Sequence, residues 1–167
     1  MQSVREDGKL FLSWSDVTSA VIGIAARIKD HHYEPKRILA VARGGLIPAT
    51  LLSHLLGVKE VGSIQLESYN EEHTSERIRM YRQTAGDLNN FQHWGNFASY
   101  WDKADTLVVD DLWDSGNTHN WIHEMFPEAV ATTLFYKDRD DNSHRIVSFP
   151  GAPLNKDRWV VFPWEIA

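Results

Sequence analysis

The sequence has 167 residues, of which 43% are hydrophobic and 11% aromatic, and its net charge is -6 at pH 7. This composition predicts one domain with a proper core and argues against disorder. The acidic balance argues against a protein that mainly binds a nucleic-acid backbone, and the lack of cysteine excludes disulfides and thiolate chemistry. The first residues contain no signal-peptide core, and no stretch approaches roughly 18 consecutive apolar residues, so we expect a soluble cytoplasmic protein.

The first part of the chain alternates between helical and extended patterns. Apolar residues recur at helical spacing over residues 17–28, and RILAVA at residues 37–42 predicts a short buried strand. Residues 43–45 form a tight connection, and residues 46–56 predict a second helix. A second strand is expected at residues 61–67.

The middle of the chain is less regular. Residues 68–75 are polar and predict a loop, whereas alternating arginines and apolar residues at 77–82 favour a strand. Residues 84–105 are rich in asparagine and aromatic residues, and we interpret them as an irregular excursion.

In the last part of the chain, strand and helix patterns alternate again. Strands are expected at residues 106–110, 130–136 and 158–162, with a helix at 118–126 and an acidic loop starting at Asp138. Strands that alternate with helices favour a parallel sheet covered on both faces.

Chemically interesting residues follow several of these strands. Residues 42–45 follow the first strand, Asp110 and Asp111 end a later one, and Lys137 follows the next. Ligands of such sheets bind at the carboxyl ends of the strands, so we expect these residues to share one site.

Residues 115–118 form a small polar loop at the start of a helix. The unpaired N–H groups there, the flexibility of Gly116 and the hydroxyls of Ser115 and Thr118 make a cradle for phosphate. The alternative is an ordinary helix cap, made by Ser115 or Asn117. No lysine follows, so the loop is not of the Walker type.

Three carboxylates precede this loop. Asp110 and Asp111 can balance a cation, either Mg²⁺ or positive charge that develops on a sugar. Asp114 lies beside the phosphate loop and can accept a proton. The alternative is that these acids simply face water at the end of a strand.

Together, these residues form a recognisable signature. VVDDLWDSGNT resembles the phosphoribosyl pyrophosphate (PRPP) binding signature of type I phosphoribosyltransferases. AVARGGLIPATLLSHLLG resembles the first strand, pyrophosphate loop and helix of that family, and SYNEE resembles the start of its mobile catalytic loop. LSWSDVTSAV, FYK and DRWVVFPWE resemble its xanthine-guanine and archaeal hypoxanthine-guanine members.

The resemblance implies an α/β protein with the type I phosphoribosyltransferase fold. This fold has a mainly parallel twisted sheet flanked by helices, with a small base-binding hood, and here a single domain would span residues 1–167. Asn117 stands at a variable position of the signature. Residues 84–105 are longer than the family pattern and would be an atypical insertion, and residues 138–156 match poorly.

The resemblance also assigns roles around PRPP. Ser115, Gly116, Asn117 and Thr118 would bind the 5′-phosphate, and the turn of Ala42, Arg43, Gly44 and Gly45 would bind pyrophosphate, with a non-proline cis peptide in relatives. Asp110 and Asp111 would hold the ribose hydroxyls and balance Mg²⁺, and Asp157 would lie near the metal bound to pyrophosphate. Ser68 and Tyr69 would begin the mobile loop.

The base would be held by another group of residues. Asp114 would face N7 of a purine, Lys137 would donate to O6, Trp159 would stack on the ring, and the backbone near Val160 would meet position 2. Without the resemblance, Lys137 would be a lysine whose charged end reaches solvent from a strand end. For the remaining tryptophans we expect core packing: Trp14, Trp94, Trp101, Trp113, Trp121 and Trp164.

His119 and His123 have the i, i+4 spacing that can bind zinc on a helix. Asn120 stands where a zincin motif needs glutamate, so an exposed helix face is the better interpretation.

The resulting functional hypothesis is purine salvage, in which PRPP and guanine, xanthine or hypoxanthine give a nucleoside 5′-monophosphate and pyrophosphate. One alternative is the same chemistry with adenine or a pyrimidine, and another is a non-catalytic sensor of PRPP or a nucleotide. Mg²⁺ is the expected cofactor, and PRPP and a purine base are the expected partners. We expect no nucleic acid or membrane partner, and a homodimer or homotetramer.

Overall fold

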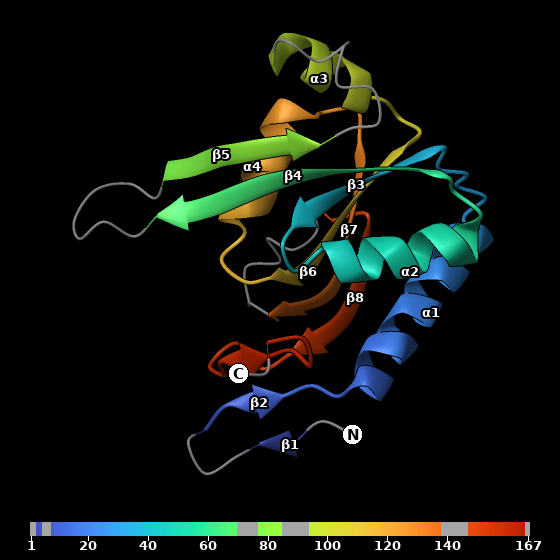
Figure 1. Ribbon diagram of the computed structural model, residues 1–167. Helices are drawn as coiled ribbons and strands as arrows, with labels where there is room; N and C mark the ends of the chain where they lie inside the picture. Colours follow the sequence, from blue (N-terminus) through green and yellow to red (C-terminus); the bar gives the residue numbers. More distant parts are fainter. Residues whose placement is uncertain (1–2, 5–7, 70–76, 85–93, 138–146, 166–167) are drawn as a thin grey trace.

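The computed structural model describes residues 3–4, 8–69, 77–84, 94–137 and 147–165. Its centre is a six-stranded sheet in the order β5-β4-β3-β6-β7-β8 (Figure 1). All neighbouring strands are parallel except β4 and β5. The strands are β3 (Arg37–Ala42), β4 (Glu60–Tyr69), β5 (Arg77–Thr84), β6 (Thr106–Trp113), β7 (Val130–Lys137) and β8 (Phe149–Leu154).

Helices cover both faces of this sheet, as expected from the alternation of strands and helices. They are α1 (Trp14–Asp30), α2 (Leu46–Leu56), α3 (Trp94–Trp101) and α4 (Asn117–Met125). Ile38 and Ala40 of β3 belong to the apolar cluster of α1 and α2, whereas Leu39 and Val41 belong to that of α3 and α4. Successive residues of a strand point to opposite faces, so β3 is buried on both sides.

Local sequence signals fix the start of α1 and the end of α2. The Asp16 N–H donates to Ser13 Oγ at 3.2 Å, while the Ser13 N–H donates to Asp16 Oδ2 at 2.9 Å. This reciprocal capping box starts α1. Gly57 ends α2 in the left-handed conformation, with φ 72°.

The order of the strands predicts where a ligand binds. The chain moves from β3 to β4 in one direction along the sheet, and from β6 through β7 to β8 in the other. The carboxyl ends of β3 and β6 therefore flank a topological switch point, which is where ligands bind in open α/β sheets.

A second, smaller sheet joins the two ends of the chain. It contains β1 (Ser3–Val4), β2 (Leu10–Phe11) and β9 (Val160–Val161), and β2 runs parallel to β9 (Figure 1). The Leu10 N–H donates to the Trp159 carbonyl at 2.8 Å, and Arg158 Nη1 donates to the Gly8 carbonyl at 3.1 Å. We call this three-stranded sheet the hood.

Several predicted boundaries were wrong. Ser68 and Tyr69 lie in β4 and pair with β5, so the loop does not begin at Ser68, and residues 70–76 lie outside the described residues. β6 continues to Trp113, so Asp110 and Asp111 are strand residues. The strand expected at 158–162 is only β9, and β8 was not expected.

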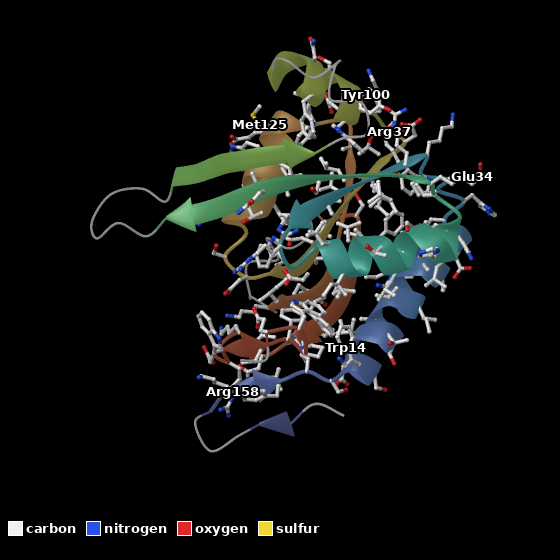
Figure 2. All side chains as sticks on the ribbon, viewed as in Figure 1. Trp14, Glu34, Arg37, Tyr100, Met125 and Arg158 are labelled. Atoms are coloured by element: carbon white, nitrogen blue, oxygen red, sulfur yellow. The ribbon has the colours of Figure 1, made fainter. Side chains whose placement is uncertain are left out.

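The excursion expected at residues 84–105 contains a helix, α3, although residues 85–93 lie outside the described residues. Arg37 Nη1 donates to the Tyr100 carbonyl at 2.8 Å, and the Arg37 guanidinium lies 4.9 Å from the centre of the Tyr100 ring (Figure 2). Phe97 and Trp101 are buried against the sheet. The segment is therefore docked on the sheet, at least over α3.

Across the described ranges, none of the helices is long and apolar enough to cross a membrane.

Candidate active site

The turn after β3 brings the backbone close to the end of β6. The peptide bond between Ala42 and Arg43 is cis. A Cβ atom at Gly44 would collide with the Asp111 carboxylate, and one at Gly45 would collide with the carbonyls of Val41 and Val109. Only glycine fits at these two positions, so the turn can lie directly against Asp111.

The adjacent acids at the end of β6 differ in environment. Asp110 is buried, and its Oδ1 accepts the Asp111 N–H at 2.9 Å, whereas Asp111 is only partly covered. Burial, together with the charge of Asp111, raises the pKa of Asp110 well above its usual value. Burial is also the main cause that raises the pKa of Asp111, and the charge of Glu165 adds to it. The pair therefore favours a nearby cation.

The loop before α4 has the geometry of an anion site. Gly116 is the N-cap, with φ 89° and no side-chain cap, so neither Ser115 nor Asn117 caps the helix. A Cβ atom on Gly116 would approach Trp113 Cζ2 to 2.7 Å. The Asn117 N–H reaches Ser115 Oγ only at 3.5 Å. The first-turn amides thus lack a side-chain cap and can bind an anion.

Lys137 and Asp114 form an ion pair beside this loop. Lys137 Nζ lies 2.9 Å from Asp114 Oδ1, and the exposed fractions of the two side chains are 10% and 47%. Lys137 is thus a buried cation at the end of β7, and its charged end does not extend freely into solvent as the alternative interpretation required. The pair places a donor and an acceptor side by side.

A cleft of about 840 Å³ opens at the switch point. Its lining combines the turn after β3 with residues from β4, β6 and the C-terminal segment: Ala42, Arg43, Gly44, Gln65, Leu66, Asp111, Trp164 and Glu165. The predicted pyrophosphate turn and the predicted catalytic carboxylate Asp111 therefore share one cavity.

The site residues predicted in the C-terminal stretch, in and beside the hood, differ in their exposure. Trp159 is 69% exposed, and Val160 is buried in β9. Asp157 is exposed, its N–H donates to Asn155 Oδ1 at 2.8 Å, and it is not among the residues that line the cleft. Glu165, eight positions later in the same sequence stretch, does line the cleft together with Asp111.

Core packing was wrong for one of the remaining tryptophans, Trp14, which is 52% exposed. Trp101 and Trp113 are buried, and Trp121 and Trp164 pack against the two core clusters, whereas the side chain of Trp94 lies outside the described residues. Trp164 lines the cleft and stacks on Phe162, with ring centroids 4.6 Å apart.

The expectation of an exposed histidine pair was also wrong. His123 is exposed, but His119 is only 2% exposed, and its Nε2 lies 3.9 Å from Asp110 Oδ2. Burial lowers the pKa of His119 to about 4, so the ring is neutral at physiological pH. His119 therefore lies beneath the carboxylates.

Sequence reasoning missed Glu165, Trp164 and His119 as parts of this region. Glu165 and Trp164 belong to a stretch whose likeness to the family was recognised, but only the folding of the C-terminal segment over the turn brings them to the cleft. For His119 the signal was its position directly after the phosphate loop, on the inward face of α4.

Comparisons with known proteins agree with this geometry. Residues 11–164 match the family model described as the phosphoribosyl transferase domain. The fold and the strand-end cavity define a protein of the phosphoribosyltransferase class, and the chain belongs to the phosphoribosyl transferase domain family. The expected α/β fold is thus confirmed.

Individual relatives make the comparison more specific. A xanthine-guanine phosphoribosyltransferase of Idiomarina loihiensis is 32% identical over 159 residues, which is 95% of this chain and 88% of the relative. The structure of a purine phosphoribosyltransferase from Pyrococcus horikoshii has a TM-score of 0.65 at 28% identity and 95% coverage of both chains. A Helicobacter pylori xanthine-guanine-hypoxanthine phosphoribosyltransferase, at 21% identity, has a TM-score of 0.60 and 93% coverage of both chains, which shows the fold alone.

Proposed function

We propose that this protein transfers ribose 5-phosphate from PRPP to a 6-oxopurine and releases pyrophosphate, as the names of its relatives suggest. One observation carries the proposal: the glycine turn after β3 lies directly against Asp111, and the uncapped N-terminus of α4 at Gly116 follows Asp111 by five residues. PRPP has a pyrophosphate at one end of its ribose and a phosphate at the other, and this arrangement offers an anion site for each. In this proposal the ribose lies between those two sites, beside the carboxylates of Asp110 and Asp111.

The carboxylates support the chemical step. When the C1′–O bond breaks, the ribose ring gains the positive charge of an oxocarbenium-like transition state. Asp111, partly covered and facing the cleft, stabilises that charge electrostatically. The turn of residues 42–45 binds the departing pyrophosphate through its backbone, and Arg43 lines the same cavity.

Magnesium fits the acids of the cleft. Asp111 and Glu165 both line the cavity, and the charge of Glu165 raises the pKa of Asp111, as expected for like charges that face one another. Glu165 Oε2 accepts the Phe162 N–H at 2.9 Å, so these two acids suit a divalent cation that is held mainly by water and substrate oxygens. Bound there, Mg²⁺ would neutralise charge on the leaving pyrophosphate.

The magnesium site is tested by a pair of variants. We expect Glu165→Gln to raise the Mg²⁺ concentration needed for half-maximal activity by about tenfold, roughly the effect of losing one outer-shell partner. Asp157→Asn tests the position that the sequence suggested. A larger shift for Asp157→Asn than for Glu165→Gln would reverse the assignment.

The ion pair of Lys137 and Asp114 matches one edge of a 6-oxopurine. Lys137 can donate to the carbonyl oxygen at position 6, and Asp114 can accept a proton from N7. Trp159, largely exposed, has a ring face available for stacking. In this proposal the base replaces the direct contact between the two charged side chains.

The test is an assay of pyrophosphate release with PRPP, Mg²⁺ and a panel of guanine, xanthine, hypoxanthine, adenine and uracil. Release with 6-oxopurines supports the proposal. Release mainly with adenine or uracil supports the same chemistry on another base. PRPP binding in calorimetry, without release for any base, supports the non-catalytic sensor.

Self-association is a second part of the proposal. Leu51 and Leu55 lie one turn apart on α2 and are 37% and 42% exposed, and Ile22 of the neighbouring α1 is 55% exposed. An apolar face of this kind is typical of a subunit interface. We expect Leu51→Glu with Leu55→Glu to lower the mass measured by analytical ultracentrifugation; an unchanged mass would place the interface elsewhere. A cytoplasmic location stays a prediction.

A further inference from the structure

His119 is a buried polar side chain that the proposed reaction does not use. It is the third residue of α4 and is 2% exposed, and its Nε2 has no hydrogen-bond partner among the described residues. Native proteins pair nearly all buried polar atoms, because a group that leaves water without gaining a partner is unfavourable. An unpaired ring nitrogen that faces a carboxylate can therefore gain a hydrogen bond through a small movement.

Asp110 is the group that Nε2 faces. Oδ2 of Asp110 lies 3.9 Å from Nε2, while Oδ1 accepts the Asp111 N–H at 2.9 Å. One oxygen of Asp110 is thus fixed by the backbone of the neighbouring acid, and the other is directed at the imidazole. Because a hydrogen bond of this type is about 2.7–3.2 Å long, the gap is too wide by roughly 1 Å.

The helix turn that carries His119 also carries the anion site. α4 starts at Asn117, directly after Gly116, and its first-turn amides have no side-chain cap. An anion bound to these amides attracts the turn electrostatically and orders it. A displacement of about 1 Å is within the usual range of adjustment on ligand binding. Phosphate binding and the contact of His119 with Asp110 can therefore be mechanically linked.

We propose that His119 is a positioning residue, whose Nε2–H donates to Asp110 Oδ2 when a sugar 5′-phosphate occupies the first turn of α4. This inference rests on the proposed function, because it assigns the phosphate of PRPP to that turn. With Oδ1 held by the Asp111 N–H and Oδ2 held by His119, the Asp110 carboxylate cannot rotate. Asp111 then keeps its orientation beside Gly44 while the ribose reacts.

Two variants and a matched control separate this role from simple packing. His119→Leu removes the ring nitrogen, His119→Gln keeps an amide donor at a similar distance from the backbone, and His123→Leu makes the same change on the exposed side of α4. We expect His119→Leu to raise KM for PRPP and lower kcat by roughly tenfold each, as for loss of a hydrogen bond to a charged group. KM for the base should stay within about twofold of the wild-type value. In His119→Gln, kcat and KM for PRPP should both return most of the way to their wild-type values.

The proton itself can be observed in the wild-type protein, which covers the case in which His119→Leu does not fold. Nitrogen-15 NMR of labelled histidine reports which ring nitrogen carries the proton. We expect the Nε2–H tautomer, with its proton signal moving downfield on addition of ribose 5-phosphate and remaining in place with ribose.

The outcomes distinguish this inference from the proposed function. Three results would each overturn the role of His119. The first is a proton signal that does not move although ribose 5-phosphate binds, the second is a proton on Nδ1, and the third is an equal loss of activity in His119→Leu and His119→Gln. If the proton signal shifts with ribose 5-phosphate but pyrophosphate is not released with any base, the role of His119 stands and the proposed transfer reaction is wrong.

Discussion

The carboxyl ends of the central strands and the hood are built differently. The first region, which we call the strand-end site, comprises the turn at residues 42–45, the acids Asp110 and Asp111, the loop at residues 114–118, and Lys137 at the end of β7. Glycines fit there without room for a Cβ atom, and Asp110 is buried. The hood consists of strands only two residues long, and Trp159 beside it is 69% exposed.

This difference assigns separate tasks to the two regions. A rigid, charged and partly desolvated site can stabilise a transition state, because its groups need little reorganisation during the reaction. An exposed aromatic ring on short strands adds binding area for any flat base, but it provides little selection among bases. We therefore expect changes in the strand-end site to alter rate or base choice, and changes in the hood to alter base affinity.

The largest expected effect compares Lys137 with Trp159. Adenine has an amino group at position 6, so its binding would set a donor against the buried Lys137 ammonium, and about 10³- to 10⁵-fold discrimination in kcat/KM is reachable. Lys137→Met should weaken the use of 6-oxopurines and narrow their advantage over adenine. Trp159→Ala should weaken all bases together. The measurement is kcat/KM for guanine, xanthine, hypoxanthine and adenine in all three proteins.

Either of two results would contradict this division of tasks. One is a wild-type preference for adenine, and the other is a Lys137→Met variant that keeps the original preference.

The second effect concerns charge at the strand-end site. Asp111→Asn keeps the size of the side chain and removes its charge, so kcat should fall by about 10²-fold or more, as for other electrostatic stabilisers. Because the pKa of Asp111 is raised, ionisation costs stability near neutral pH, and the melting temperature should hold or rise. Asp30→Asn, on the exposed last residue of α1, is the control. Wild-type turnover of Asp111→Asn at saturating PRPP and Mg²⁺ would remove Asp111 from the mechanism.

The third effect concerns Gly57, which follows α2, and Gly116, which precedes α4; both have a left-handed backbone conformation. Gly57→Ala places a Cβ atom in open space, so its cost is that of the left-handed backbone, about 1–2 kcal/mol. Gly116→Ala adds a contact with the buried Trp113 ring and should cost more, about 2–4 kcal/mol in all. Urea unfolding measures both variants. Equal costs would mean that the loop before α4 can shift away from Trp113, and so is less rigid than its packing indicates.

Sequence reasoning performed best where short-range physics fixes the structure. The strand at residues 37–42 and the helix at 46–56 were predicted with their observed ends, because apolar periodicity, the glycine turn and Gly57 all act locally. β8 escaped prediction because FPGAPL contains two prolines and a glycine, which a strand tolerates when it lies at the edge of a sheet, as β8 does. Glu165 escaped because its place beside Asp111 depends on contacts between segments distant in sequence.

The last effect tests the buried side of the strand-end site through acid stability. Burial lowers the pKa of His119 to about 4 from the ordinary histidine value of 6.5, so between these values the unfolded chain binds the extra proton. The free energy of unfolding should therefore fall as the pH drops from 6.5 towards 4, by no more than about 3 kcal/mol from this group. His119→Leu should lose less stability over that range than the wild type does. His123→Leu, whose ring was exposed, should follow the wild-type curve. The measurement is urea unfolding at a series of pH values, and parallel curves for wild type and His119→Leu would show that the imidazole is solvated in the folded state.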